Sequence, residues 1–368
     1  MASERYNRQV ILEGFGEEAQ QRLAQAKVLV IGAGGLGCPI LQYLAAAGVG
    51  HLGIADGDTV SISNLHRQVL FTTEEVGELK VHVARKRLLA MNPEIEIRAY
   101  PVQLQQHNIL DIIGSYDIII DGTDNFGSRY LINDVCALLD KPLVFAAVSE
   151  YEGQLCIFSR KDQTGVRCNY RDLFPVAPAP GEIGNCAENG VLGVVPGLIG
   201  SMAATEAIKL ISGLGKPLIN QLLHYNVLQM AQYELQITPG TGYHLPETTA
   251  EFLTMNYTNT PANKRSYTEI ETDQLTDFKH EPSTLLIDVR ERHEYPQLDN
   301  EVYTKVPMSE LAAFLEQPLE AENLVFICQH GIRSVAAAEA FHDKYGATKK
   351  IYSLKGGIAK WRNYFLNT

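Results

Sequence analysis

The sequence KVLVIGAGGLG, residues 27–37, determines the fold class of the first part of the chain. Its apolar run at 27–31 has the composition of a buried strand. A helical pattern follows at 36–47, and a second apolar run at 51–55 ends at Asp56. This order predicts a β-α-β unit. The glycines between the first strand and the helix are Gly32, Gly34, Gly35 and Gly37.

The same alternation continues along the chain and predicts a Rossmann-like, mostly parallel sheet with helices on both faces. Further strands are expected at 94–100, 116–121, 142–147 and 154–158, and helices at 80–91, 129–139 and 198–212. Residues 238–265 are rich in Pro, Gly and Asn, which predicts a linker with at most one short helix. A second, smaller α/β pattern follows, with strands at 284–289 and 324–328 and helices at 308–316 and 334–345. We therefore expect domains at 1–240 and 265–368, joined by a linker at 241–264.

Composition narrows the class of protein. The chain has 368 residues, 45% of them apolar, and carries 31 Lys and Arg against 43 Asp and Glu. A net charge of −12 argues against general nucleic-acid binding, which needs a basic face. No apolar run approaches the roughly 20 residues that span a bilayer, and the N-terminus lacks the apolar core of a signal peptide. We expect a cytoplasmic protein that binds no membrane.

The glycine-rich loop predicts a nucleotide site. Glycines let the backbone approach phosphates, and the following helix N-terminus offers unpaired N–H groups. Asp56 ends the second strand and is placed to accept hydrogen bonds from a ribose. Taken alone, this pattern is most typical of an NAD or FAD enzyme.

Charged residues elsewhere favour ATP over a dinucleotide, because a triphosphate needs several cations. Arg67 and Lys80 lie in the segment after Asp56, and Arg8 precedes the first strand. Asp124 follows another strand and offers a carboxylate for magnesium. Each of these residues taken singly is also compatible with a solvated charge or a helix cap. Together they indicate ATP and Mg²⁺.

Five motifs resemble the MoeB/ThiF family in order and spacing over residues 5–237. They are Arg-Tyr-x-Arg-Gln at 5–9, Gly-x-Gly-Gly-Leu-Gly at 32–37, Asp-x-Asp-x-Val at 56–60, Ser-Asn-Leu-x-Arg-Gln at 63–68 and Thr-Asp-Asn at 123–125. The family is similar to ubiquitin-activating enzymes and adenylates the C-terminal Gly-Gly carboxylate of a ubiquitin-like sulfur carrier. The resemblance implies an ATP site lined by Gly35, Asp56, Asp58, Ser63, Asn64, Arg67, Gln68, Lys80, Asp124 and Asn125. It also implies a homodimer in which Arg8 reaches the partner subunit's site.

The sequence departs from the family at its structural zinc site. Family members commonly carry Cys-Tyr-Arg-Cys-Leu-Phe-Pro, with a second Cys-x-x-Cys near the end of the domain. Here Asn169 and Asp172 replace both cysteines of the first pair, Cys168 is one residue out of register, and residues 238–263 contain no Cys. We predict no zinc, because a tetrahedral thiolate site has no ligands.

Two cysteines are candidates for chemistry. Cys186 lies in a segment that matches the family's region around a cysteine thought to link covalently to the carrier, although a structural thiol is the alternative. Cys328 follows an apolar strand and begins the loop CQHGIRS, which leads into a helix. Backbone N–H groups, the helix N-terminus and Arg333 would favour an anion on sulfur.

The spacing from Cys328 to Arg333 is Cys-x4-Arg, one residue shorter than the phosphatase loop and suited to a terminal sulfur atom. With Asp288-Val289-Arg290-Glu291 and the Gly356-Gly357-Ile358 motif, the loop resembles rhodanese domains over 266–366. The fusion resembles molybdopterin-synthase adenylyltransferase/sulfurtransferases. That resemblance implies adenylation of a MoaD-like or ThiS-like carrier and sulfur transfer from a Cys328 persulfide to give a thiocarboxylate, for molybdopterin, thiamine or thiolated-tRNA synthesis.

Other functions remain open at this point. The rhodanese-like domain could be a non-catalytic docking module beside an adenylating enzyme. A plain dehydrogenase would leave Arg8, Lys80 and Asp124 unexplained. A thiosulfate-detoxifying rhodanese would leave the first 240 residues without a role, and a non-catalytic scaffold predicts no pyrophosphate exchange. The residues name neither the carrier nor the upstream sulfur donor.

Overall fold

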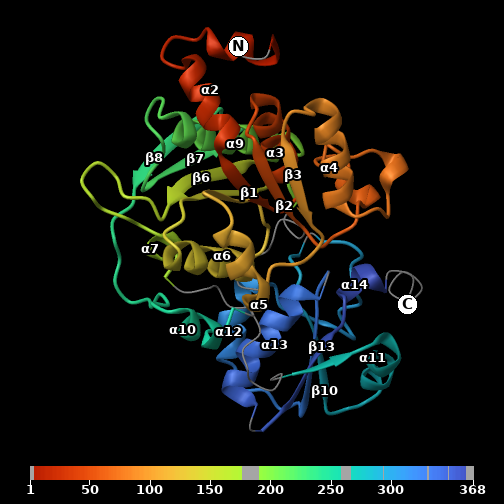
Figure 1. Cartoon of the computed structure of the whole chain (residues 1–368). Coiled ribbons are helices and arrows are strands. Elements are labelled where there is room, and N and C mark those ends of the chain that lie inside the picture. Colours follow the sequence, from red (N-terminus) through yellow and green to blue (C-terminus); the bar gives the residue numbers. More distant parts are fainter. Residues whose placement is uncertain are drawn as a thin grey trace. The chain divides into compact units, whose positions relative to one another are not determined.

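The structure is a computed structural model that describes residues 4–175, 190–257, 267–292, 294–329, 331–346 and 348–361. These residues form two compact units, which divide between 257 and 267. Each unit is an α/β structure with its own sheet (Figure 1). The predicted class, a mostly parallel α/β domain followed by a small α/β domain, is confirmed.

The sheet of the first unit has the strand order β3-β2-β1-β4-β5-β6-β7-β8. Its strands are β1 (Lys27–Ile31), β2 (His51–Ala55), β3 (Glu96–Tyr100), β4 (Ile118–Asp121), β5 (Leu143–Ser149), β6 (Glu152–Phe158), β7 (Gln221–Asn226) and β8 (Ala231–Gln236). Strands β1 to β5 pair in parallel, and β6, β7 and β8 continue the sheet in antiparallel pairs. The parallel half therefore directs the loops after β1, β2 and β4 to one edge.

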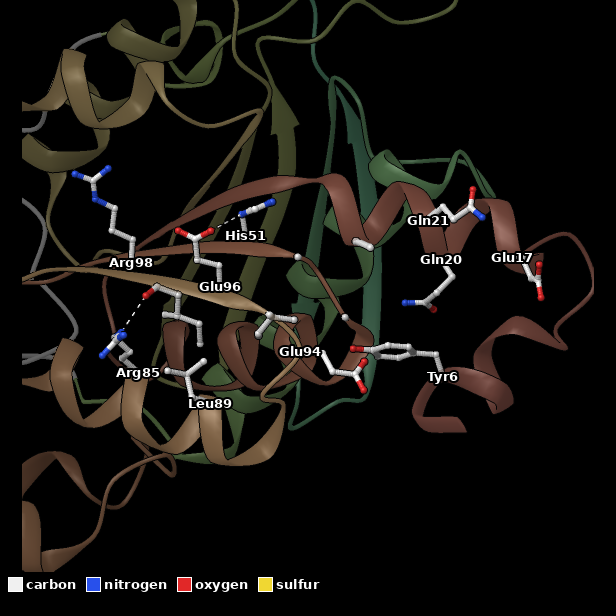
Figure 2. Close-up of a pocket in the computed structure, with 15 residues that line it drawn as sticks. Tyr6, Glu17, Gln20, Gln21, His51, Arg85, Leu89, Glu94, Glu96 and Arg98 are labelled. Carbon is white, nitrogen blue, oxygen red and sulfur yellow. Dashed lines mark hydrogen bonds and ion pairs between the residues drawn. The ribbon is translucent and has the colours of Figure 1, made fainter. Parts of the chain in front are cut away.

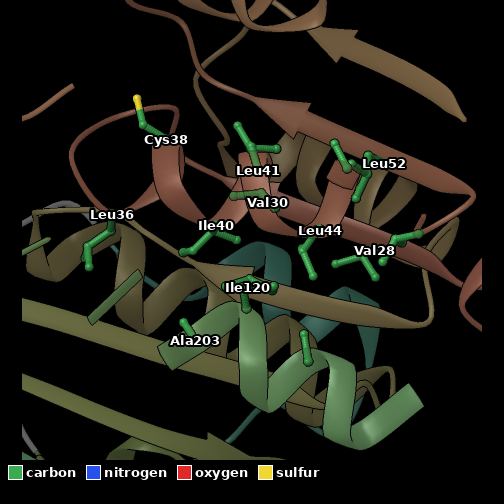
Figure 3. Close-up of a cluster of buried hydrophobic side chains, with 14 of the residues drawn as sticks. Val28, Val30, Leu36, Cys38, Ile40, Leu41, Leu44, Leu52, Ile120 and Ala203 are labelled. Carbon is green, nitrogen blue, oxygen red and sulfur yellow. The ribbon is translucent and has the colours of Figure 1, made fainter. Parts of the chain in front are cut away.

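Both faces of this sheet are buried at its central strands β1 and β4, as the continuous apolar run in β1 predicts. Val28 and Val30 enter one cluster, beneath α2, α3, α4 and α9, and Figure 3 shows part of it. Leu29 and Ile31 enter the other, beneath α5, α6 and α7. The helices are α1 (Asn7–Val10), α2 (Gly16–Gln25), α3 (Gly37–Ala47), α4 (Lys80–Met91), α5 (Gln106–Gly114), α6 (Phe126–Leu138), α7 (Tyr170–Leu173), α9 (Val194–Ser212) and α10 (Thr249–Thr254), with 3-10 turns η1 (Glu4–Tyr6), η2 (Ile62–Asn64) and η3 (Thr73–Glu75).

Against the expectation from sequence that no apolar run approaches membrane-spanning length, helix α9 is long and apolar enough to cross a membrane by length and composition. In the fold it packs against α3, β5 and β6, and Val195, Ile199 and Ala203 are buried. Gly153 of β6 lets it approach closely, because a Cβ there would lie 2.2 Å from Ile199. The apolar sequence of α9 is thus accounted for by the protein core.

The first unit continues past residue 240, through part of the segment predicted as a linker. Helix α10 places Phe252 in the core with no exposed surface. The Gln106 side chain donates to the carbonyl oxygens of Phe252 (2.9 Å) and Met255 (2.7 Å), and the Tyr257 hydroxyl donates to Asp134 (2.8 Å). Buried aromatic contacts therefore fasten residues 241–257 to the first unit despite their loop-like composition.

The second unit contains a five-stranded parallel sheet of order β11-β10-β12-β13-β9. Leu324 and Phe326 of the central strand face α13, whereas Val325 and Ile327 face the opposite cluster with Leu275 and Ile358. Its elements are β9 (Thr268–Ile270), α11 (Thr272–Lys279), β10 (Thr284–Asp288), β11 (Thr304–Lys305), η4 (Met308–Glu310), α12 (Leu311–Leu315), β12 (Asn323–Ile327), α13 (Ile332–Tyr345), β13 (Lys350–Leu354) and α14 (Gly357–Lys360). Strand β12 ends one residue before Cys328.

Candidate functional site

The glycine loop between β1 and α3 packs backbone against backbone. Gly32 has φ +93°, and a Cβ on it would lie 2.9 Å from the carbonyl oxygen of Gly122. A Cβ on Gly37 would lie 1.9 Å from the carbonyl oxygen of Gly32. These two glycines are therefore required by the fold of the loop, while Gly34 and Gly35 line the adjacent cavity.

We predict that Gly37→Ala disrupts this loop. The added methyl group cannot fit without moving the backbone at Gly32, so the variant should lose measurable ATP binding and unfold at a lower temperature than wild type. Isothermal titration calorimetry and thermal unfolding measure the two effects. Gly114→Ala is the matched control, because a Cβ at Gly114 meets nothing within 4 Å. Wild-type ATP affinity in Gly37→Ala would contradict the packing argument.

Asp56 ties the loops after β1 and β2 together. Its Oδ2 accepts from the backbone N–H of Ala33 (2.7 Å) and its Oδ1 from that of Asp58 (2.8 Å). Burial raises the pKa of the Asp56 carboxyl, and the nearby charge of Lys80 opposes that rise. Each carboxylate oxygen keeps a second lone pair for a ribose hydroxyl.

Lys80, the first residue of α4, is a buried cation beside the same loops. It is 4% exposed, and its Nζ donates to Asp58 Oδ2 at 3.0 Å. Arg67 is half-buried, and its guanidinium donates to the Ser63 carbonyl oxygen (3.3 Å) and lies 2.7 Å from His66 Nε2. The two predicted cations therefore line one cavity.

Asp124 and Asn125 follow β4 in a loop shaped by Asp121. Asp121 is fully buried, and its Oδ1 accepts from the backbone N–H (2.9 Å) and hydroxyl (2.7 Å) of Thr123. Burial raises the pKa of the Asp121 carboxyl, and its Oδ2 has no hydrogen-bond partner. The Asn125 side chain caps α6 by accepting from the N–H of Ser128 (2.9 Å). Asp124 is left exposed at the cavity.

These loops enclose a cavity of about 400 Å³ at the carboxyl ends of β1, β2 and β4. Ten predicted residues line it: Gly32, Gly34, Gly35, Asp56, Asp58, Arg67, Gln68, Lys80, Asp124 and Asn125. The buried Oε1 of Gln68 has no partner, which marks a polar atom available to a ligand. Ser63 and Asn64 are not among the residues that line the cavity, but the Asn64 carbonyl oxygen accepts from the N–H groups of the lining residues Arg67 and Gln68.

Several lining residues had no sequence signal of their own. Arg129 is 9% exposed, its guanidinium lies 5.4 Å from the Phe126 ring and 5.6 Å from the Phe145 ring, and its Nε has no partner. In the sequence, nothing distinguishes Arg129 from any other arginine within a helix. The segment Val102, Gln103 and Leu104, after β3, supplies a more apolar wall.

A second cavity, of about 850 Å³, lies at the opposite, amino ends of β2 and β3 (Figure 2). His51 and Glu96 begin those strands and pair with each other at 3.2 Å, and Arg85 donates to the Ile97 carbonyl oxygen at 3.0 Å. None of the predicted nucleotide residues lines it. Volume therefore does not identify the nucleotide site in this fold, whereas the strand ends do.

In the second unit, Cys328 follows β12 and is 1% exposed. Its Sγ accepts from the backbone N–H of Gly331 at 3.1 Å and lies 3.4 Å from Ser334 Oγ. Gly357 packs closely against the loop, because a Cβ there would lie 2.4 Å from the Cys328 carbonyl oxygen. The glycine motif near the end of the chain therefore supports the loop that begins at Cys328.

Arg333 is held by Glu294, which sequence reasoning did not identify. Its guanidinium makes two hydrogen bonds to that carboxylate, at 2.6 and 2.7 Å. Bonding to Glu294 raises the pKa of Arg333, and burial opposes the rise. Beside this pair, Arg290 is buried, bonded twice to Asp288, and 3.4 Å from Gln329 of the cysteine loop. The loop is thus braced by two arginines, each of them already paired with a carboxylate.

The other described cysteines lie in buried surroundings. Burial raises the pKa of the Cys38 thiol to about 12 and that of Cys168 to about 11, and it raises the pKa of Cys136 and Cys156 as well. Raised values keep these thiols protonated and unreactive. Cys186 lies outside the described residues, so its predicted role stays a prediction.

Comparison with known proteins agrees with this geometry. Residues 6–241 match the model of the ThiF family, and residues 271–364 match that of the rhodanese-like domain. The chain belongs to the ThiF family. The family assignment, predicted from five short motifs, is confirmed over 64% of the chain by a relative with 51% identity, the Thermus thermophilus sulfur carrier protein adenylyltransferase, of which the match covers 87%.

The two-domain arrangement of this ThiF-family chain is shared with longer relatives. The probable adenylyltransferase/sulfurtransferase MoeZ of Mycobacterium tuberculosis is 40% identical over 97% of this chain and 92% of its own. The probable molybdopterin-synthase adenylyltransferase of Porphyra purpurea is 35% identical over 99% and 94%. The chain is accordingly an enzyme of the adenylyltransferase and sulfurtransferase class. The crystal structure of Escherichia coli MccB shares the fold of the first unit, with a TM-score of 0.57 and 22% identity over 65% of this chain and 73% of that one.

Proposed function

We propose that the first unit uses ATP to adenylate the C-terminal carboxylate of a ubiquitin-like sulfur carrier, and that the second unit supplies sulfur from Cys328 to give a thiocarboxylate. The observation that carries the proposal is the cavity at the carboxyl ends of β1, β2 and β4, which joins a glycine loop to two cations. Carrier-dependent ATP–pyrophosphate exchange tests it, with MoaD-like and ThiS-like carriers assayed in parallel.

Adenylation brings together a carboxylate and a triphosphate, both of them anions. A carboxylate oxygen of the carrier forms a bond to the α-phosphorus, and the bond from that phosphorus to pyrophosphate breaks. Lys80 and Arg67 lower the repulsion and hold the phosphates in line, which is where most of the rate enhancement of such transfers arises. Asp58 keeps Lys80 directed at the cavity.

Asp124 is the residue we propose to hold Mg²⁺. It is exposed at the cavity, and in the described part of the chain no cluster of three His, Cys, Asp or Glu side chains could hold a metal ion. A single carboxylate fits Mg²⁺, which usually binds to one or two carboxylates together with substrate phosphates. Bound there, the ion would stabilise the charge that develops on pyrophosphate.

Sulfur transfer then needs a nucleophile from the second unit. The terminal sulfur of a Cys328 persulfide attacks the acyl-adenylate carbonyl, and AMP leaves with the electron pair of the broken C–O bond. A second thiol, for which Cys186 is the candidate, attacks the Cys328 sulfur of the resulting acyl disulfide. The S–S bond breaks, the thiocarboxylate leaves with its electron pair, and a Cys186–Cys328 disulfide remains that an external thiol must reduce before the next turnover. The covalent tether raises the effective concentration of the sulfur donor near the adenylate to the order of millimolar.

We also propose that the enzyme acts as a homodimer in which Arg8 completes the partner's site. Arg8 is exposed on α1 and does not line the cavity of its own chain. Exposed apolar side chains lie nearby in sequence and on α3 and α9: Ile11 (63%), Leu12 (58%), Tyr43 (57%) and Val194 (56%). Exposed apolar side chains of this size are typical of interfaces with a second copy.

A mixing experiment tests this arrangement. Arg8→Ala and Asp124→Ala should each be inactive alone, and co-expression of the two should restore about a quarter of the wild-type exchange rate. Half of the random dimers are mixed, and each mixed dimer holds one site with both residues intact. The control for dimer formation is an equal mixture of the wild-type chain and a chain that carries both substitutions. If the mixed sample remains inactive, Arg8 does not act across subunits.

A further inference from the structure

A compact hydrogen-bond cluster joins α7 to the segment after β8. The carboxylate of Asp172 is its centre. Its Oδ2 accepts from the backbone N–H of Asn169 (2.7 Å) and from Asn169 Nδ2 (2.9 Å), and its Oδ1 accepts from the N–H of Gly240 (2.6 Å) and from the Tyr243 hydroxyl. Asn169 Nδ2 also donates to the Tyr243 oxygen at 2.8 Å. We call these four residues the Asp172 cluster.

The Asp172 cluster has the spacing of a pair of Cys-x-x-Cys motifs. Asn169 and Asp172 are three residues apart, and so are Gly240 and Tyr243. A Cβ added to Gly240 would lie 3.5 Å from Asp172 Oδ1 and 3.6 Å from Cε1 of Tyr243. A side chain at position 240 would therefore point into the cluster without a clash, so that all four positions converge on one point.

The residues present do not fit the zinc that the family resemblance implies. Zinc in structural sites takes four thiolate or imidazole ligands, whereas these positions hold an amide, a carboxylate, a glycine and a phenol. Burial and the bond to Asp172 raise the pKa of Tyr243 to about 12, which keeps the phenol protonated and donating. The neighbouring thiol of Cys168 donates to the Ile237 carbonyl oxygen at 3.5 Å and is likewise kept protonated by burial.

Hydrogen bonding within the cluster is complete. One carboxylate receives four donors, two from each segment, so it connects α7 to residues 240–243 as a tetrahedral ion would connect two pairs of thiolates. The Arg171 side chain continues the attachment by making two hydrogen bonds to buried Asp134. Among the described residues, no buried side-chain nitrogen or oxygen atom of the cluster lacks a hydrogen-bond partner.

We propose that the Asp172 cluster replaces a structural zinc site: a carboxylate-centred set of hydrogen bonds performs the cross-linking role of the metal, at four positions with the spacing of two Cys-x-x-Cys pairs. Two consequences follow. The stability of the first unit is independent of zinc, and thiolates restored at the four positions create a zinc site. Neither consequence depends on which carrier or sulfur donor the enzyme uses.

The first test compares single variants of the full chain. Asp172→Asn places an amide NH₂ against existing donors, and Tyr243→Phe removes one donor. Each should lower the unfolding temperature of the first unit, by about 2–4 °C for each hydrogen bond lost. The matched controls are Asp111→Asn, on the exposed face of α5, and Tyr233→Phe, 53% exposed on β8, which should stay within about 1 °C of wild type. Wild type should unfold at the same temperature with and without a strong zinc chelator.

The second test installs the ligands. The variant Asn169→Cys/Asp172→Cys/Gly240→Cys/Tyr243→Cys should bind one zinc per chain, show the absorption of tetrahedral thiolate coordination when loaded with Co²⁺, and lose stability when chelated. A three-cysteine variant that keeps Gly240 should bind the metal more weakly. Solubility only when expressed with zinc also supports the proposal.

Three results would overturn the proposal. They are about one tightly held zinc per wild-type chain, a folded four-cysteine variant that binds no metal, and an Asp172→Asn variant as stable as Asp111→Asn. If the four-cysteine variant fails to fold both with and without zinc, the comparison of Asp172→Asn with Asp111→Asn decides the outcome.

Discussion

Asp124→Ala should lower carrier-dependent ATP–pyrophosphate exchange by at least about 10²–10³-fold, the usual cost of removing one group that stabilises transition-state charge. The same variant should transfer sulfur from thiosulfate to cyanide at the wild-type rate. The reason is that Asp124 lies at the nucleotide cavity of the first unit, whereas Cys328 and its loop are built entirely from the second.

Asp111→Ala is the matched control for that variant, because Asp111 is exposed on α5 and lines neither described cavity. Raising the Mg²⁺ concentration should restore part of the activity of an Asp124→Asn variant, since a weaker oxygen ligand remains. Loss of both activities in a folded Asp124→Ala protein would show that the two chemistries are not separable. Full exchange activity would remove Asp124 from the proposed mechanism.

Cys328→Ala should abolish thiocarboxylate formation from thiosulfate while leaving pyrophosphate exchange intact. Removing an attacking thiolate costs more than about 10³-fold, because no neighbouring group can replace the sulfur. Mass spectrometry of the carrier follows the product, as a gain of one sulfur in place of one oxygen. Added sulfide should bypass the defect by attacking the acyl-adenylate directly.

Cys136→Ala is the control for that experiment, since Cys136 is buried in the first unit, where burial raises the pKa of its thiol well above the ordinary value. Wild-type thiocarboxylate yield from Cys328→Ala would favour the alternative of an adenylating enzyme with a rhodanese-like docking module. The pairing of Arg333 with Glu294 makes this alternative worth testing, because the positive charge of that arginine is already balanced by a carboxylate.

The elements that could be predicted from sequence are those in which buried positions are occupied by apolar residues or glycines. Strand β1 and the loop to Gly37 are apolar or glycine-rich because both faces of the strand and the loop backbone are packed. The hairpin of β7 and β8 was missed although AQYELQ alternates apolar and polar residues, because that alternation spans only six residues and every residue of β8 is exposed.

The candidate site divides in the same way. Asp56 and Arg67, which lie within short motifs, could be placed at the nucleotide site from sequence together with the family resemblance. Arg129 and Glu294 could not, because their roles depend on contacts formed only after folding: Arg129 with rings from α6 and β5, and Glu294 with a residue 39 positions away. The attachment of residues 241–257 to the first unit could not be predicted for a similar reason, since a single buried Phe252 outweighs many loop-forming neighbours.

The position of α9 in the chain affects how long this apolar helix is exposed without packing partners during synthesis. During synthesis, a 19-residue apolar helix that emerges without partners resembles a segment destined for a bilayer. The elements on which α9 packs, α2, α3, β4, β5 and β6, all precede it in sequence. Because the chain is made from its N-terminal end, all of these packing partners have been synthesised before α9 leaves the ribosome. The order of elements thus shortens the exposure of the most apolar helix to membrane-targeting and aggregation pathways.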